Sequence, residues 1–489
     1  MPKGAHVDYH PRWHQQFRQL GARWRAARIV PLLEPRDVSS GPLVHHHLVI
    51  RKQPAAAILL VADGDAWQLP RLVTGDRHTA EVDYLNAAAL ERWGIAITIL
   101  RCVDDVFLPE RQTIVRAYDA EHHGQQRALP PGVRWCTAEE LPSIRWARDA
   151  DAAAVQLALA PPDGSHRGRG WTQLGWWDDA CAWIGQQLVR RGAAAITHIE
   201  QLRAWEFSTV LRVDTAGGHA FFLKALPADP LREWCVTDYL AREFPGIGPS
   251  IVARDAERRW LLMDAFVGER LEVIGDMSAW ERAVRIYARL QRACSTRLAD
   301  LTTLGCDTVS LQHLAACIAP LIDDVAAMRP ARGEPLTPAE VAHVRAAAPE
   351  LHRRCQALAA IDVPLTLEHG DLWPGNILVN TAACVIIDWE DARIAHPFLS
   401  LAPLFAGLRS HPPSVDFAAV TRRLADAYVA AFANDVPQPD LHRALALAQP
   451  LAFLEIANRY RQQPASIVRL HPWMPELVPV FLRLMLRAL

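Results

Sequence analysis

The sequence predicts an α+β protein that contains more than one domain. Its 489 residues exceed what a single hydrophobic core usually organises, so two or three domains are expected. Three regions differ in pattern: strands and helices mix from about residue 41, strands dominate from about residue 195, and helices dominate after about residue 271. Because a small strand-rich part precedes a larger helical part, we expect two lobes with a cleft between them.

The first region, residues 41–160, alternates strand and helix signals. Apolar runs at Leu43–Arg51 and Ala56–Val61 predict strands, and Asp63-Gly64-Asp65 predicts a turn after them. A helix is expected from Thr79 to Trp93, ended by Gly94. The polar, glycine-rich stretch 161–170 predicts a flexible linker. Residues 1–40 are an N-terminal extension without the apolar core of a secretory signal.

The composition argues against several classes of partner. The net charge is −2, which gives no basic surface for nucleic acid or an anionic membrane. Apolar runs never reach about 18 residues, so no membrane span is expected. The nine cysteines are widely spaced and form no Cys-x-x-Cys pair, which favours reduced thiols and a cytoplasmic protein. The oligomeric state cannot be read from these features.

The most informative stretch is His369-Gly-Asp371-Leu-Trp-Pro-Gly-Asn376, followed by two short apolar strands and then Asp388. A hairpin of strands 377–379 and 385–387 would bring Asn376 and Asp388 together, with Asp371 on the loop beside them. Phosphoryl transfer to a hydroxyl needs a carboxylate near the attacking oxygen and oxygen ligands that hold magnesium on the triphosphate. This spacing therefore predicts a magnesium-phosphate site.

The same stretch resembles the catalytic and metal-binding loops of the aminoglycoside phosphotransferase/choline kinase superfamily, whose members have a protein-kinase-like fold. The resemblance implies that Asp371 is the catalytic aspartate. It also implies that Asn376 and Asp388 are magnesium ligands, with Glu390 as a candidate ligand of a second metal. By the same resemblance, His369 braces the loop.

Upstream residues fit this resemblance. Lys224 ends an apolar strand and would hold the α- and β-phosphates of ATP. Glu233, on an expected helix, is its candidate partner, and Glu243 is a rival for that role. In this scheme residues 171–268 form the N-lobe, and residues 269–489 form a helical C-lobe that carries the catalytic loop.

Two further segments take part by the same resemblance. Residues 205–213 resemble the hairpin that covers the phosphates, without the Gly-x-Gly-x-x-Gly of protein kinases, and Ser208 is the nearest polar contact there. Backbone groups of Asp264 and Phe266, at the junction of the lobes, would bind adenine. Trp373 and Ser400 depart from the residues common in relatives, which have His and a structural Asp at these places.

The first region resembles a Nudix domain. The resemblance rests on Trp67-Gln-Leu-Pro70, the helix that ends in Glu91-Arg-Trp-Gly94, and the closing segment 134–142. A Nudix signature needs several glutamates on one helix to hold divalent metals around a diphosphate. Aligned on Gly94, only Glu91 remains of that set. The region is therefore expected to be a degenerate Nudix-like α/β/α domain without hydrolase activity, whose role the sequence does not reveal.

The sequence as a whole predicts an ATP- and Mg²⁺-dependent phosphotransferase that moves the γ-phosphate to a hydroxyl of a small-molecule acceptor. Two alternatives are a Nudix-type nucleotide-diphosphate hydrolase and a non-catalytic nucleotide-binding regulator. The identity of the acceptor and the preference for ATP over GTP are not readable. Arginines outnumber carboxylates after residue 400, so a polycationic aminoglycoside is not the expected acceptor.

Overall fold

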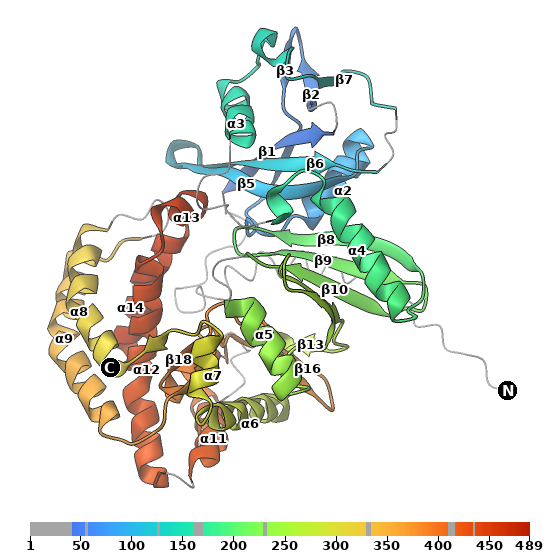
Figure 1. The fold of residues 1–489 in the computed structure, drawn as a ribbon. Coiled ribbons are helices and arrows are strands. Elements are labelled where there is room, and N and C mark those ends of the chain that lie inside the picture. Colours follow the sequence, from blue (N-terminus) through green and yellow to red (C-terminus); the bar gives the residue numbers. More distant parts are fainter. Residues whose placement is uncertain are drawn as a thin grey trace.

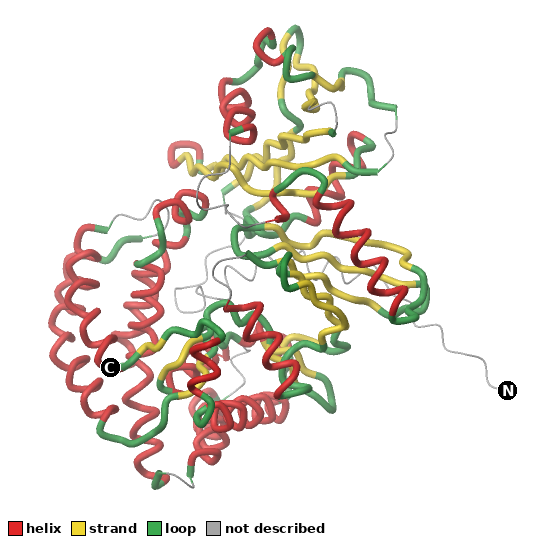
Figure 2. The backbone as a smooth tube through the Cα atoms, in the orientation of Figure 1, coloured by secondary structure: helices red, strands yellow, loops and turns green. Residues whose placement is uncertain are grey.

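The computed structural model describes residues 42–53, 57–124, 128–160, 170–227, 232–328, 334–408, 416–433 and 436–489. The expected N-terminal extension 1–40 and residues 161–169 of the expected linker lie outside these ranges. Three parts follow one another in Figure 1: an N-terminal unit (residues 42–160), a smaller lobe built on a sheet, and a larger lobe made mainly of helices. Figure 2 shows how the strands are confined largely to the first two parts.

The N-terminal unit is a seven-stranded mixed sheet with one helix on each face. The strands follow the order β3-β2-β1-β6-β5, with β4 paired to β1 and β7 paired to β2; β1 and β6 are parallel. Their bounds are β1 (Leu43–Lys52), β2 (Ala57–Asp63), β3 (Ala66–Gln68), β4 (Arg71–Gly75), β5 (Ile97–Leu108), β6 (Thr113–His122) and β7 (Val133–Cys136). Because side chains alternate along a strand, Leu48 and Ile50 pack toward helix α2 (Asp83–Trp93), while Val49 packs toward α3 (Asp149–Leu159).

The predicted helix in this unit begins later than expected. It starts at Asp83 rather than Thr79, because Ala80 and Glu81 pair with strand β8 (Ile196–Ala204) of the smaller lobe instead. Its end is as predicted: Gly94 takes the left-handed backbone conformation, φ 68°, and its N–H bonds the last turn.

The smaller lobe is a five-stranded antiparallel sheet covered by helix α4 (Trp176–Arg190). The strand order is β11-β12-β10-β9-β8. Residues spaced by four on α4, among them Ala180, Ile184 and Leu188, pack on the sheet, as expected for an amphipathic helix. The other elements are β9 (Thr209–Thr215), β10 (Ala220–Ala225), β11 (Ile251–Asp255), β12 (Trp260–Asp264) and helix α5 (Arg232–Glu243).

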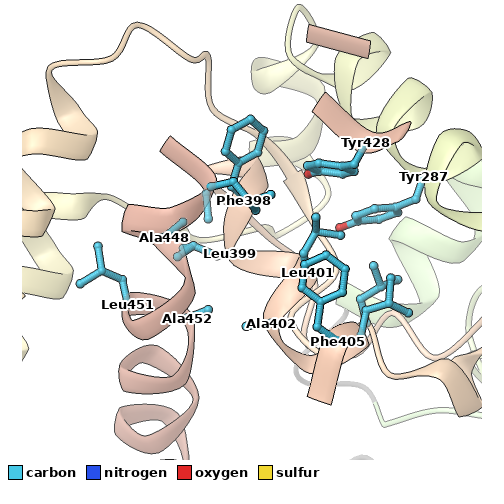
Figure 3. Close-up of a cluster of buried hydrophobic side chains, with 14 of the residues drawn as sticks. Tyr287, Phe398, Leu399, Leu401, Ala402, Phe405, Tyr428, Ala448, Leu451 and Ala452 are labelled. Carbon is cyan, nitrogen blue, oxygen red and sulfur yellow. The ribbon is translucent and has the colours of Figure 1, made fainter. Parts of the chain in front are cut away.

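Most of the larger lobe is helical. Its helices are α6 (Met277–Cys294), α7 (Leu298–Thr303), α8 (Leu311–Ala327), α9 (Pro338–Ala359), α10 (Leu401–Leu408), α11 (Phe417–Val429), α12 (Gln438–Arg461), α13 (Ala465–Leu470) and α14 (Met474–Ala488). Within its core, Figure 3 shows Phe398 and Tyr428 packed close to Tyr287, with the Phe398 and Tyr428 rings 5.4 Å apart. None of the helices in the described ranges combines the length and apolar character that a membrane crossing needs.

Two small three-stranded sheets in this lobe present the loops of the site. One has the order β13-β16-β17 and the other β14-β18-β15. The strands are β13 (Glu269–Arg270), β14 (Thr308–Val309), β15 (Thr366–Glu368), β16 (Ile377–Val379), β17 (Cys384–Ile386) and β18 (Arg393–Ala395). The predicted hairpin is thus present as β16 and β17.

The N-terminal unit contacts both lobes. Toward the smaller lobe, the Gln201 side chain of β8 bonds both the N–H and the C=O of Ile99 at 2.8 Å. Toward the larger lobe, α13 lies against β5, where Arg469 Nη1 donates to the Val103 carbonyl at 3.4 Å. The first part of the chain is therefore a packed component of the molecule.

Candidate active site

The loop between β15 and β16 is held by a glycine and a histidine. Gly370 has φ 83°, and a Cβ there would lie 2.3 Å from the Asp391 carbonyl oxygen, so only glycine fits. His369 Nε2 lies 3.0 Å from the Ile387 carbonyl, and its Nδ1 accepts the Asp371 N–H at 3.2 Å. These two bonds require a neutral ring protonated at Nε2. His369 thereby links the loop carrying Asp371 to the residue that precedes Asp388.

Asp371 and Asn376 are joined directly. Asn376 Nδ2 donates to the Asp371 carbonyl at 3.0 Å and to Asp371 Oδ2 at 3.2 Å. The amide nitrogen is used within the loop, so Oδ1 is the atom Asn376 can offer to a cation. The Ile387 N–H donates to the Asn376 carbonyl at 3.0 Å, which sets Asn376 beside the chain just before Asp388.

Lys224 brings the two lobes together at this point. Its Nζ bonds Glu233, on helix α5, and lies 2.9 Å from Asp388 Oδ1. The rival Glu243 instead bonds Arg297 at 3.1 Å, so the expected Lys224–Glu233 pair is the one that forms. Burial alone would lower the pKa of Lys224, but Asp388 and Glu233 hold that pKa above its usual value.

Asp388 has a backbone conformation that is uncommon for a residue with a side chain. Its φ is 69°, in the left-handed region, where aspartate is tolerated better than most residues but still at a cost of about 1 kcal/mol. Such strain concentrates at functional sites, because the surrounding structure must impose it. Here it aims the carboxylate at Lys224, and Lys224 and Arg203 hold its pKa below the usual range although burial alone would raise it.

Three carboxylates crowd together beside Lys224. One oxygen from each of Glu233, Asp388 and Glu390 lies within 4.8 Å of the other two. Burial, and then the charges of Asp388 and Glu233, raise the pKa of Glu390 well above its usual value. Burial likewise raises the pKa of Glu233 to about 7, with Lys224 opposing the shift.

These residues fit a hard divalent cation. Carboxylate oxygens are the ligands that Mg²⁺ prefers, and Glu233 Oε2 is buried without a hydrogen-bond partner among the described residues. A cation at this place would relieve the repulsion that raises the pKa of Glu390. In the part of the chain that the structure describes, this is the one group of three carboxylate, histidine or cysteine side chains close enough to share an ion.

Two arginines lie at the site although no sequence pattern predicted them there. Arg203, on β8, helps to lower the pKa of Asp388, and its guanidinium lies 5.4 Å from the Trp205 ring centroid. Arg459, on α12, donates to the Gly370 carbonyl at 2.8 Å and pairs with Asp391. Both come from elements far in sequence from the loop that carries Asp371, so only the folded structure reveals them.

The other expected contacts are mostly used by the protein itself. Ser208 is buried, and its Oγ accepts the Trp205 indole N–H at 3.2 Å. The Asp264 carboxylate accepts from Ser250 Oγ at 2.8 Å, and the N–H groups of Asp264 and Ala265 bond carbonyls of the sheet. The sheet therefore uses the first two N–H donors of the segment that ends at Phe266.

The chain was then compared with known proteins. The profile described as the phosphotransferase enzyme family, APH, matches residues 198–447, just over half of the chain. A comparison with curated proteins gives no match.

Several solved structures are similar to this chain. One is macrolide 2'-phosphotransferase MphH from Brachybacterium faecium, at 18% identity and a TM-score of 0.40, covering 62% of this chain and 98% of that one. A second is choline kinase from Cryptosporidium parvum, at 13% identity and a TM-score of 0.44, covering 60% and 88%. A third is spectinomycin phosphotransferase in complex with ADP and spectinomycin, at 12% identity and a TM-score of 0.41, covering 62% and 98%.

Proposed function

The chain belongs to the phosphotransferase enzyme family, and we propose that it transfers the γ-phosphate of ATP to a hydroxyl of a small molecule with the aid of Mg²⁺. The observation that carries this proposal is the meeting of Lys224 with Glu233 and Asp388, next to the bonded pair Asp371 and Asn376. A fixed cation beside oxygen ligands, with a carboxylate on the adjoining loop, is what phosphoryl transfer requires.

Each residue of this group has a distinct task in the proposal. Lys224 binds the α- and β-phosphates, and Glu233 holds its ammonium group in place. Asp371 accepts the hydrogen bond of the acceptor hydroxyl and takes its proton as the new O–P bond forms and the bond to ADP breaks. Asn376, Asp388 and Glu390 would hold Mg²⁺, which neutralises charge on the phosphates.

We further assign nucleotide contacts to the strand-rich lobe. The Phe266 N–H is the donor we assign to adenine, together with the carbonyl of Asp264, since the N–H groups of Asp264 and Ala265 are used by the sheet. Ser208 contributes through its backbone, because its hydroxyl is engaged by Trp205. Gly268 keeps this segment against the catalytic hairpin: a Cβ there would lie 2.5 Å from the Val379 carbonyl oxygen.

The N-terminal unit is, in our proposal, Nudix-like in fold and without hydrolase activity. The mixed sheet with one helix on each face supports the fold, and Glu91 is exposed at the end of α2. Ala87 and Leu90 stand where a Nudix signature has glutamates, which argues against a Nudix-type hydrolase. We place the domain boundaries near residues 161–170 and 268, and the nine unpaired cysteines support a cytoplasmic protein.

The first experiment is a thermal-shift titration of ATP with and without Mg²⁺. We expect ATP to stabilise the folded protein only when Mg²⁺ is present. At a ligand concentration one hundred times the Kd, the free energy of unfolding should rise by about 2.7 kcal/mol. Asp388→Asn should lose this metal dependence, since asparagine keeps the backbone conformation and removes the charge. Glu91→Gln is the matched control in the N-terminal unit and should behave as wild type.

The outcomes separate the three functions considered. Mg²⁺-dependent binding followed by transfer of labelled γ-phosphate to a compound in a hydroxyl library supports the kinase. Binding without transfer to any acceptor favours a regulator, and hydrolysis of a nucleotide diphosphate that Glu91→Gln abolishes favours a hydrolase. Efficient phosphorylation of kanamycin-class compounds would contradict our expectation for the acceptor.

A further inference from the structure

A second site lies in the N-terminal unit, apart from the kinase residues. A cavity of about 400 Å³ opens where the end of α2 meets the β2–β3 hairpin, the start of β4 and the residue before α3. Three arginines line it, Arg71, Arg92 and Arg148, and Trp93 and Asp63 line it with them. The size suits a small organic ligand.

Among the residues that the structure describes, no carboxylate is bonded to the guanidinium of Arg71. Its Nη2 lies 2.7 Å from His45 Nδ1, so the imidazole is the acceptor there and stays neutral. Burial and the charge of Arg71 lower the pKa of His45, which agrees with that role. The Nε of Arg71 is buried and has no hydrogen-bond partner among the described residues. One donor of this guanidinium is therefore unused.

The other two guanidiniums are only partly compensated. Arg148 donates to the Gln68 amide oxygen, and its Nη2 is 3.5 Å from Asp63 Oδ2. Arg92 is exposed, and its Nη1 lies 3.5 Å from the Arg71 carbonyl. Asp63 is thus the one carboxylate in the lining of a cavity that three guanidiniums share.

Like Asp63, the buried Asp151 offsets part of the positive charge of Arg71. It is completely buried beneath the cavity, where it bonds the His47 imidazole and accepts the Leu69 N–H at 3.2 Å. Its attraction supports the charge of Arg71, while the repulsion between Arg71 and Arg148 remains. An anion between these two guanidiniums would relieve that repulsion.

We propose that this cavity binds a phosphorylated small molecule. Guanidinium groups match the geometry of phosphate oxygens with paired hydrogen bonds, and three of them line this cavity. Trp93, Leu69 and Val61 supply an apolar wall for the organic part of the ligand. The anion is held by arginines and needs no metal, because one carboxylate in the lining cannot make a cation site.

The test measures the affinity of the full chain for phenyl phosphate by isothermal titration calorimetry. We expect phenyl phosphate to bind, inorganic phosphate and benzoate to bind more weakly, and phenol not to bind. Affinity should fall as salt is raised, because the partly exposed arginines are screened. Arg148→Gln should weaken binding by about tenfold or more, with Arg148→Lys restoring part of the loss.

Two controls locate the site. Arg111→Gln removes an exposed arginine elsewhere in the same unit and should leave the affinity unchanged. Lys224→Ala should also leave it unchanged, so the inference does not rest on the proposed kinase activity. Equal binding of phenyl phosphate to wild type and Arg148→Gln, or its loss in Lys224→Ala, would overturn the proposal. So would an absence of binding at millimolar probe to the folded wild-type chain, or a preference for benzoate.

Discussion

The hydrogen bond between Glu206 and His471 ties three parts of the molecule together. Glu206 lies in the β8–β9 loop that we assign to the phosphates, and His471 follows α13 in the larger lobe. The His471 Nε2 bonds Glu206, and its Nδ1 lies 3.3 Å from the Thr79 hydroxyl of the N-terminal unit. Both side chains of the pair are at most 1% exposed. Replacing His471 by alanine should therefore free the loop.

The loss of stability expected for His471→Ala follows from the burial of His471 and Glu206. Removing the hydrogen-bond partner of a buried carboxylate is strongly destabilising, by about 3–5 kcal/mol. Glu206→Gln keeps the shape and loses the charge, so it should cost less. Once Glu206 is replaced by a neutral amide, His471→Ala removes a weaker hydrogen bond, so the double variant should lose less stability than the sum of the single losses. In a double-mutant cycle of Glu206→Gln and His471→Ala, we expect a coupling free energy of at least about 1.5 kcal/mol.

Hydrogen–deuterium exchange of residues 203–209, read by mass spectrometry, measures this loop directly. A loss of about 3 kcal/mol should speed its exchange by roughly a hundredfold when local opening controls it. His442→Ala is the control, because His442 pairs with Asp426 at 3.3 Å on the surface of the same lobe. Such surface pairs contribute about 0–1 kcal/mol. Equal exchange in both histidine variants, or strictly additive losses in the cycle, would refute the reasoning.

Three further changes probe the site and the core. Glu233→Gln removes the partner of Lys224 and should weaken ATP binding about 10- to 100-fold in calorimetry; unchanged affinity would remove Glu233 from the site. Gly370→Ala combines φ 83° with a Cβ only 2.3 Å from Asp391, so it should lower the melting temperature and abolish stabilisation by Mg²⁺ and ATP. Burial lowers the pKa of His396 from 6.5 to about 3, so the folded state binds that proton more weakly than the unfolded chain. Its stabilising contribution is present above about pH 6.5 and is lost as the pH falls toward 3; His396→Asn should flatten this part of a stability curve from thermal melts, and an unchanged slope would contradict the assignment.

Local sequence patterns predicted the elements that present the site. The hairpin of β16 and β17 follows from two short apolar runs around a turn, and Asn380 makes that turn by accepting the N–H groups of Ala382 and Ala383. The resemblance to the family named Glu233 as the candidate partner of Lys224, with Glu243 as a rival, and the structure contains the Lys224–Glu233 pair. Interactions of this kind depend on a few neighbouring residues, so the sequence carries enough information for them.

Interactions between distant segments could not be predicted in this way. The start of α2 was wrong because Ala80 pairs with a strand more than a hundred residues away, which overrides helix propensity. Arg203, Arg459 and His471, the partner of Glu206, reach their contacts only when segments distant in sequence pack together. Each of them is an ordinary charged residue in its own stretch of sequence.

Ser400 illustrates how a missing residue type is compensated by its surroundings. It replaces the aspartate that many relatives have, yet its Oγ bonds Glu368 at 2.9 Å and lies 2.7 Å from the Tyr287 hydroxyl. Glu368 in turn bonds Arg393 at 2.6 Å, and Arg393 also pairs with Glu455. Ser400 is therefore part of a buried hydrogen-bond network at the base of the loop that carries Asp371.

The same packing gives the N-terminal unit a physical connection to the proposed chemistry. The unit bonds β8 through Gln201 and Ile99, and β8 leads directly into the loop that holds Glu206. On its other side, Thr79 contacts His471, the partner of that loop. A relative movement of the two lobes would have to break one of these contacts. The N–H and C=O groups of Ile99 and the hydroxyl of Thr79 therefore connect the unit to both sides of the loop that holds Glu206.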